Sequence, residues 1–229
     1  MAIDLHELPQ IVTAIGGLGT AAFGLVDATK ALWGGVNHIG FGAIKTTVAS
    51  LTPGNPTNAL SQQKIIETLQ ANWFNGTDLG SQKSIAKSLI KLNLNAANAA
   101  ALAAATGVDS ATLTTVATKI AAGTPLVGNE SDVYARFDLI LTALLDETYQ
   151  RSDDFYRNWT RAIAGIVAVA LAVVGGLTLN GVTPNGKVDW LNIGKSVMVG
   201  LLATPLAPIA KDLSTALATA VNTLQLVKK

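Results

Sequence analysis

The side chains that could carry chemistry are few and scattered. The sequence has no cysteine, which excludes disulfides, thiolate metal sites and cysteine nucleophiles, and its histidines are His6 and His38 alone. Acidic residues gather in one predicted helix, at Asp146, Glu147, Asp153 and Asp154. Asp146 and Asp153 are two turns apart, about 10.5 Å along the axis, and no Glu-x-x-His motif accompanies them. We therefore expect no catalytic, cofactor or metal site; an enzyme would need carboxylates or tyrosine hydroxyls gathered in a cleft.

One oppositely charged pair lies at the end of an uncharged segment. Asp27 and Lys30 have i,i+3 spacing and follow the uncharged run of residues 8–26. An ion pair inside a bilayer would indicate ion or proton traffic. A first span of about 19 residues ends where this pair begins, so we favour an interfacial pair. Asp27 and Lys30 remain the candidate functional ion pair.

The long uncharged segments predict helices that cross a membrane. Charged residues make up 14% of the chain and hydrophobic residues 49%, whereas about one quarter of a typical soluble domain is charged. Residues 8–26 and 162–182 carry no charge, and residues 196–210 form a shorter uncharged run. About 20 apolar residues in a helix span a hydrocarbon core of about 30 Å. Buried helices of a soluble protein are the alternative interpretation of each segment.

A cleaved signal peptide is a further alternative for the first segment. Signal peptides begin with basic residues, but this sequence begins with Asp4 and Glu7 and has no early Lys or Arg. We expect a retained anchor.

We predict an all-α, polytopic membrane protein with three transmembrane helices. The expected domains are an N-terminal transmembrane helix (1–36), a linker or interfacial segment (37–59), a helical soluble domain (60–160), a transmembrane hairpin (161–211) and a C-terminal amphipathic helix (212–229). The amphipathic helix would carry Leu213, Leu217, Val221 and Leu224 on one face, suited to packing on protein.

The soluble domain has clear signals for helix ends. Gly107 and Gly123 predict helix ends, and Asp109 predicts a helix start. No breaker interrupts the residues from about 131 to about 179, which predicts one helix about 70 Å long that rigidly couples the soluble domain to the membrane. The row of Lys83, Lys87 and Lys91 is interpreted as a solvated face rather than a nucleic-acid or lipid stripe, because this domain contains more acidic than basic residues.

Small residues recur at every fourth position within each predicted span. Such stripes let helix backbones approach closely in lipid. The helix-packing residues are Gly16, Thr20, Gly24 and Ala28; Ala164, Ala168, Ala172 and Gly176; and Ser196, Gly200 and Thr204. We expect a homo-oligomer. The alternative is that the three spans of one chain pack on each other.

Aromatic and basic residues indicate how the chain would be oriented. Trp33, Trp159 and Trp190 flank the spans as an interface belt. Basic residues concentrate on the side of residues 27–161 and of the C-terminus, whereas Lys187 and Lys195 lie on the other side. The positive-inside rule then places the soluble domain and C-terminus in the cytoplasm and the N-terminus outside, in a plasma or inner membrane.

The expected function is structural. We expect a non-enzymatic integral membrane protein that self-associates as a scaffold or anchors a larger membrane assembly. Its expected partners are the lipid bilayer, further copies of itself and proteins of a membrane complex, with no nucleic acid because the net charge is only +1. The alternative is an oligomeric pore or channel, with a third span kinked by Pro205 and Pro208.

Overall fold

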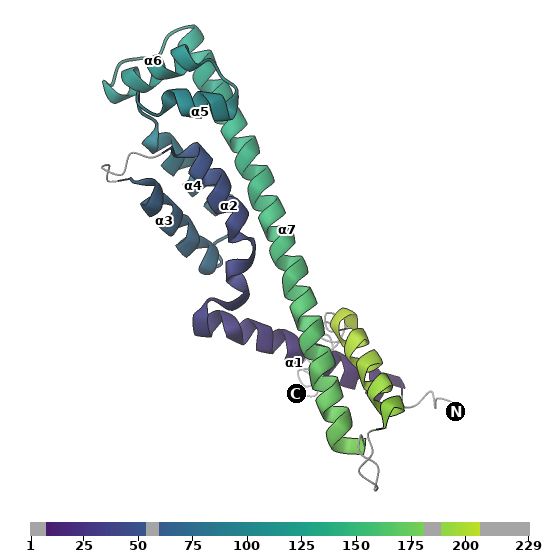
Figure 1. Ribbon diagram of the computed structural model, residues 1–229. Helices are drawn as coiled ribbons and strands as arrows, with labels where there is room; N and C mark the ends of the chain where they lie inside the picture. Colours follow the sequence, from purple (N-terminus) through teal and green to yellow (C-terminus); the bar gives the residue numbers. More distant parts are fainter. Residues whose placement is uncertain (1–7, 54–59, 181–188, 207–229) are drawn as a thin grey trace, which may run out of the picture. The chain divides into compact units, whose positions relative to one another are not determined.

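A computed structural model describes residues 8–53, 60–180 and 189–206 of the chain (Figure 1). All regular structure in these residues is helical, which confirms the predicted all-α class. The chain divides into two compact units. Unit 1 comprises residues up to Val36 and from Arg157 onward, and unit 2 comprises Asn37–Tyr156. The predicted amphipathic helix of residues 212–229 lies outside the described residues.

Unit 1 consists of long apolar helices. It contains α1 (Leu8–Trp33), the later part of α7 (Asn129–Asn180) and a helix over residues 190–206. By length and composition, α1 and α7 could each cross a membrane, at Ile11–Lys30 and within Asn129–Thr178. The helix of residues 190–206 covers only part of the predicted third span, whose remainder lies outside the described residues. Two candidate spans are therefore established, not three.

The interior of unit 1 is built from small side chains. Ala22 of α1, Ala168 of α7 and Ala203 of the 190–206 helix are fully buried against one another. Larger residues such as Leu18 and Leu171 are partly buried and pack against this cluster. Several other large apolar side chains of the same helices are exposed, at Leu25, Ile166, Val174, Met198, Leu201 and Leu202.

Unit 2 has the opposite arrangement, with large side chains in its core. It contains α2 (His38–Leu51), α3 (Gln62–Phe74), α4 (Leu79–Asn93), α5 (Ala99–Thr106), α6 (Ser110–Ala121) and the first part of α7. The bulkiest fully buried side chains are Tyr149, Phe137, Ile44, Leu51, Ile65, Leu69 and Ile90. Burying each such side chain contributes about 1.5–3 kcal/mol, so this core can hold the unit together in water.

Helix α2 differs from the linker expected at residues 37–59. Phe41, Ile44, Val48 and Leu51 are buried in the core of unit 2, because their spacing of three, four and three residues places them on one helical face. The helix bends at Gly40, whose φ is +95°. A Cβ there would lie 2.7 Å from the carbonyl oxygen of Ser152, so only glycine fits. Residues 54–59 of the expected linker lie outside the described residues.

Helix ends in unit 2 follow the local sequence signals. The Asp109 side chain accepts a hydrogen bond of 2.7 Å from the backbone N–H of Thr112, which confirms the predicted N-cap of α6. Gly107 closes α5 in the left-handed conformation, with φ +68°. Helix α7 runs unbroken over Asn129–Asn180, in agreement with the helix predicted from about residue 131 to about 179.

Candidate functional site

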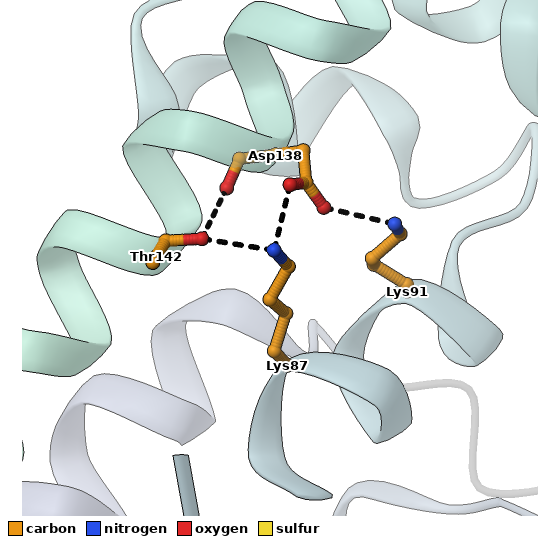
Figure 2. A network of polar contacts seen from close by, with 4 residues as sticks. All are labelled: Lys87, Lys91, Asp138 and Thr142. Atoms are coloured by element: carbon orange, nitrogen blue, oxygen red, sulfur yellow. Dashed lines mark hydrogen bonds and ion pairs between the residues drawn. The ribbon is translucent and has the colours of Figure 1, made fainter. Parts of the chain in front are cut away.

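A ladder of ion pairs joins α4 to the first part of α7 (Figure 2). The Lys87 ammonium donates to Asp138 Oδ2 at 2.6 Å and to Thr142 Oγ1 at 3.0 Å. Lys91 Nζ donates to Asp138 Oδ1 at 2.8 Å, and Thr142 donates to the Asp138 backbone oxygen at 2.7 Å. One turn earlier on α4, Lys83 pairs with Asp146 at 2.6 Å. The two helices therefore run antiparallel here, because rising lysine numbers meet falling aspartate numbers.

These contacts correct the interpretation of the lysine row as a solvated face. Lys83, Lys87 and Lys91 are each only 25–30% exposed at the side chain. The signal that could have found their partners is the matching i,i+4,i+8 spacing of Asp138, Thr142 and Asp146 on α7. Spacing alone did not reveal that these two rows face each other.

The ion pairs of the ladder shift the pKa of Asp138 and the pKa of Lys91. Partial burial opposes ionisation of Asp138, but hydrogen bonds from Lys87 and Lys91 outweigh it and lower the pKa of the carboxyl below its ordinary value. Burial likewise opposes the charge of Lys91, yet its hydrogen bonds to Asp138 and Tyr134 raise the pKa of the ammonium. The Lys91 ammonium also lies 5.0 Å from the centroid of the Tyr134 ring. Asp138 and Lys91 are therefore both charged at neutral pH.

Two of the four residues in the acidic cluster of α7, Asp146 and Glu147, form ion pairs. Asp146 contacts Lys83, and Glu147 pairs with Arg151 at 3.5 Å one turn along the helix. Among the described residues, no group of His, Asp and Glu could hold a metal ion.

The small residues of α7 and of the 190–206 helix pack on each other inside unit 1. A Cβ added to Gly200 would lie 2.5 Å from Val169 Cα and 3.0 Å from the Ala168 carbonyl oxygen, so the two backbones touch there. A Cβ added to Gly176 would collide with the Ser196 side chain. A Cβ added to Gly165 would lie 3.3 Å from Thr204 Oγ1. Ala164 and Ala168 are fully buried, and Ala172 is partly buried.

The stripe on α1 is placed differently. Gly16 is buried, but Thr20, Gly24 and Ala28 are exposed, and a Cβ added at Gly24 would meet nothing within 4 Å. The face of α1 that packs within unit 1 instead carries Ala22 and Val26. Hence three of the four residues of this stripe are exposed in the described part of unit 1.

The candidate ion pair and the interface belt lie on accessible surface. Asp27 and Lys30 form an ion pair of 2.6 Å, in which the Asp27 side chain is 64% exposed. Trp159 and Trp190 are exposed, whereas Trp33 is the last residue of α1 and its side chain is not described. Asp27 shares the exposed face of α1 with Thr20 and Gly24, because these positions fall within about 60° of one another on a helical wheel.

Comparisons of the chain with protein families, curated proteins and solved structures give no match.

Proposed function

We propose that this chain is a non-enzymatic integral membrane protein whose unit 1 lies in the bilayer and self-associates, anchoring unit 2 as part of a larger membrane assembly. The supporting observation is the inverted burial of unit 1, in which alanines are inside while Ile166, Met198 and Leu201 are outside. In the proposed orientation unit 2 is cytoplasmic and the N-terminus lies on the other side.

The solvent around unit 1 follows from the energetics of its surface. Exposing a large apolar side chain to water forgoes about 1.5–3 kcal/mol each, and unit 1 exposes many of them on adjoining helices. In hydrocarbon that exposure costs nothing, and helix association depends on close packing of small residues. Ala168, Gly200 and Ala203 supply that packing.

Self-association would use α1. The stripes of α7 and of the 190–206 helix pack on each other, as in the alternative of packing within one chain. The stripe of α1 keeps Thr20, Gly24 and Ala28 exposed, which leaves a surface suited to the same stripe of a second copy. A two-fold contact of this kind would bring like faces of α1 together.

The test is a mass measurement of the full chain purified in mild detergent. We expect a defined oligomer, which Gly24→Leu converts to monomer because the leucine separates the two α1 backbones. Gly175→Leu is the matched control, since a Cβ at Gly175 also meets nothing within 4 Å but lies on α7 outside the stripes. A monodisperse wild-type monomer that retains no partner from native membrane contradicts self-association. Chain that stays in the supernatant after ultracentrifugation without detergent contradicts membrane insertion.

A pore is the second candidate, favoured by the position of Asp27 on the exposed face of α1. If several copies met along this face, Thr20 and Asp27 would line the axis of the assembly. This candidate predicts ion flux through reconstituted liposomes that changes with Asp27→Asn. Electrically silent bilayers containing the oligomer would exclude it.

A further inference from the structure

A groove in unit 2 runs along one face of α4. Its floor is formed by Ser84, Lys87, Ser88, Lys91 and Leu92, which recur at three- and four-residue spacing. Over the span of this face the groove follows the helix for about 12 Å, or roughly two turns. Its volume is about 540 Å³.

The walls of the groove come from two other helices of the same unit. Ile120 of α6 and Tyr134 of α7 complete the lining. Three helices fixed by the core of unit 2 therefore shape the groove, so it is formed before any partner arrives.

The charge of the groove is positive. Lys87 and Lys91 line it, and no carboxylate does. Both ammonium groups share one counter-charge, Asp138, so the three groups carry a net charge of +1. Each ammonium has three N–H donors, of which Lys87 directs two to Asp138 and Thr142, and Lys91 directs two to Asp138 and Tyr134, so one donor remains on each. The half-buried lysines can therefore donate to a further acceptor without losing the ladder.

The lining of the groove also includes exposed apolar side chains. The Leu92 side chain is 69% exposed and Ile120 is 44% exposed, although both belong to the water-facing unit 2. Covering them would remove apolar surface from water, at about 25 cal/mol per Å². The groove thus combines two ammonium groups that can donate hydrogen bonds with the exposed apolar side chains of Leu92 and Ile120.

We propose that this groove binds an acidic amphipathic helix of a partner protein, with a carboxylate at Lys87 and Lys91 and a large aliphatic side chain over Leu92 and Ile120. Helix-in-groove recognition reads such a pattern of anchors at i, i+3, i+4 and i+7. Two lysines and the acidic excess of unit 2 do not make a nucleic-acid surface, which needs a wide basic patch. The inference deepens the proposed anchor role by naming the chemistry of the anchored partner, and it rests on that role for its biological use.

The probe is a set of fluorescent, alanine-rich helical peptides of about 16 residues, titrated against the full detergent-solubilised chain by anisotropy. The first carries Glu at i and i+4 and Leu at i+7 and i+8. A second replaces Glu by Gln, and a third replaces Leu by Ser. We expect the first peptide to bind at least about tenfold more tightly than either of the others, because each of those lacks one class of anchor.

Ser88→Glu tests the position of the site. Ser88 is exposed on α4 and lines the groove, so the added carboxylate repels the peptide. We expect affinity to fall by about tenfold or more at low salt. Thr68→Glu is the matched control, because it adds the same charge at an exposed position of α3 that does not line the groove.

Several outcomes overturn the proposal. These are no binding of the acidic peptide, equal binding of its Gln twin, or equal losses in Ser88→Glu and Thr68→Glu. Inorganic phosphate or anionic phosphatidylserine vesicles binding through Ser88-sensitive contacts, while the acidic peptide does not, would reassign the groove to a small anion or a lipid headgroup. If a monomeric chain bound the peptide, the groove proposal would stand and self-association would be refuted. If an oligomeric chain did not bind the peptide, self-association would stand and the groove proposal would be refuted.

Discussion

Units 1 and 2 solve the same packing problem with side chains of opposite size. Ala22, Ala168 and Ala203 fill the interior of unit 1, whereas Phe137 and Leu69 belong to the large interior side chains of unit 2. Both interiors are made of helices. The difference therefore lies in the size of the buried side chains and not in the secondary structure.

With unit 1 in a bilayer, as proposed above, the two interiors differ because the solvents around them differ. In water, large apolar side chains stabilise a fold when they move inside, as in unit 2. In lipid they gain nothing by moving inside, so close backbone approach decides the packing. Substitutions of buried residues should consequently have opposite effects in the two units. Removing side-chain volume should destabilise unit 2, and adding side-chain volume should destabilise unit 1.

The largest effect is expected in unit 2 from Phe137→Ala. The phenyl ring is fully buried, and truncating such a ring costs about 3–5 kcal/mol. The free energy of unfolding can be measured with denaturant by following the fluorescence of Trp73, which packs in the same core. Leu139→Ala on the same helix is the control, because Leu139 is 70% exposed and should change stability by less than about 0.5 kcal/mol. Equal losses in both variants would erase the distinction between core and surface.

In unit 1 the reverse substitution, Gly200→Leu, should be damaging. Its Cβ would overlap the backbone of Val169, and overpacking of this kind costs about 1–3 kcal/mol. The readout is a disulfide engineered by Gly165→Cys and Thr204→Cys, in a chain that has no natural cysteine. The disulfide should form in this background and fail to form with Gly200→Leu.

Gly194→Leu is the control for the Gly200 experiment. It lies on the same 190–206 helix, and a Cβ there meets nothing within 4 Å. The disulfide should persist in this variant. A disulfide that also persists with Gly200→Leu would show that close backbone contact is not what holds these helices together.

A smaller effect is expected from Asp138→Asn in unit 2. Removing the shared carboxylate leaves Lys87 and Lys91 without their counter-charge and should cost about 1–2 kcal/mol at neutral pH. Because the folded-state pKa of Asp138 is lowered, its contribution is complete above the ordinary pKa of 3.8 and is lost as pH falls through the lowered value. The wild type and Asp138→Asn should therefore converge in stability at acidic pH. A constant difference down to the lowest pH would refute the ion-pair explanation.

The smallest effect is expected from Asp27→Asn in unit 1. Asp27 is mostly exposed and pairs with Lys30 within one helix, so its loss should change stability by only a few tenths of a kcal/mol. Thermal unfolding in detergent provides the measurement. A loss as large as that of Asp138→Asn would show that Asp27 sits in a far less polar setting than its exposure indicates.

Local signals made much of the fold predictable. Helix starts and ends could be inferred from sequence because capping residues such as Asp109 and Gly107 act on neighbouring residues only. The length of α7 could be inferred because no helix breaker interrupts residues 129–180. Their physical causes are capping hydrogen bonds and backbone conformations that need no tertiary partner.

The features that were not predicted depend on contacts distant in sequence. The lysine row needed Asp138, which lies 47 residues beyond Lys91. The segment of α2 was expected to be a linker or interfacial segment, because its apolar face is buried only when α2 packs on α3 and α5. Which face of α1 stays open likewise depends on where Ala168 and Ala203 pack. Sequence spacing identified candidate faces, but only tertiary packing determined which of them meet.

The volume rule of unit 1 has a consequence for how such a chain can diverge over time. Ile166, Met198 and Leu201 face outward, where in lipid any aliphatic side chain would serve, whereas Gly200 must stay glycine. Homologues could therefore differ at most positions of this unit while keeping the same interior packing. Related sequences would then share the spacing of small and large residues in this unit rather than the residue types.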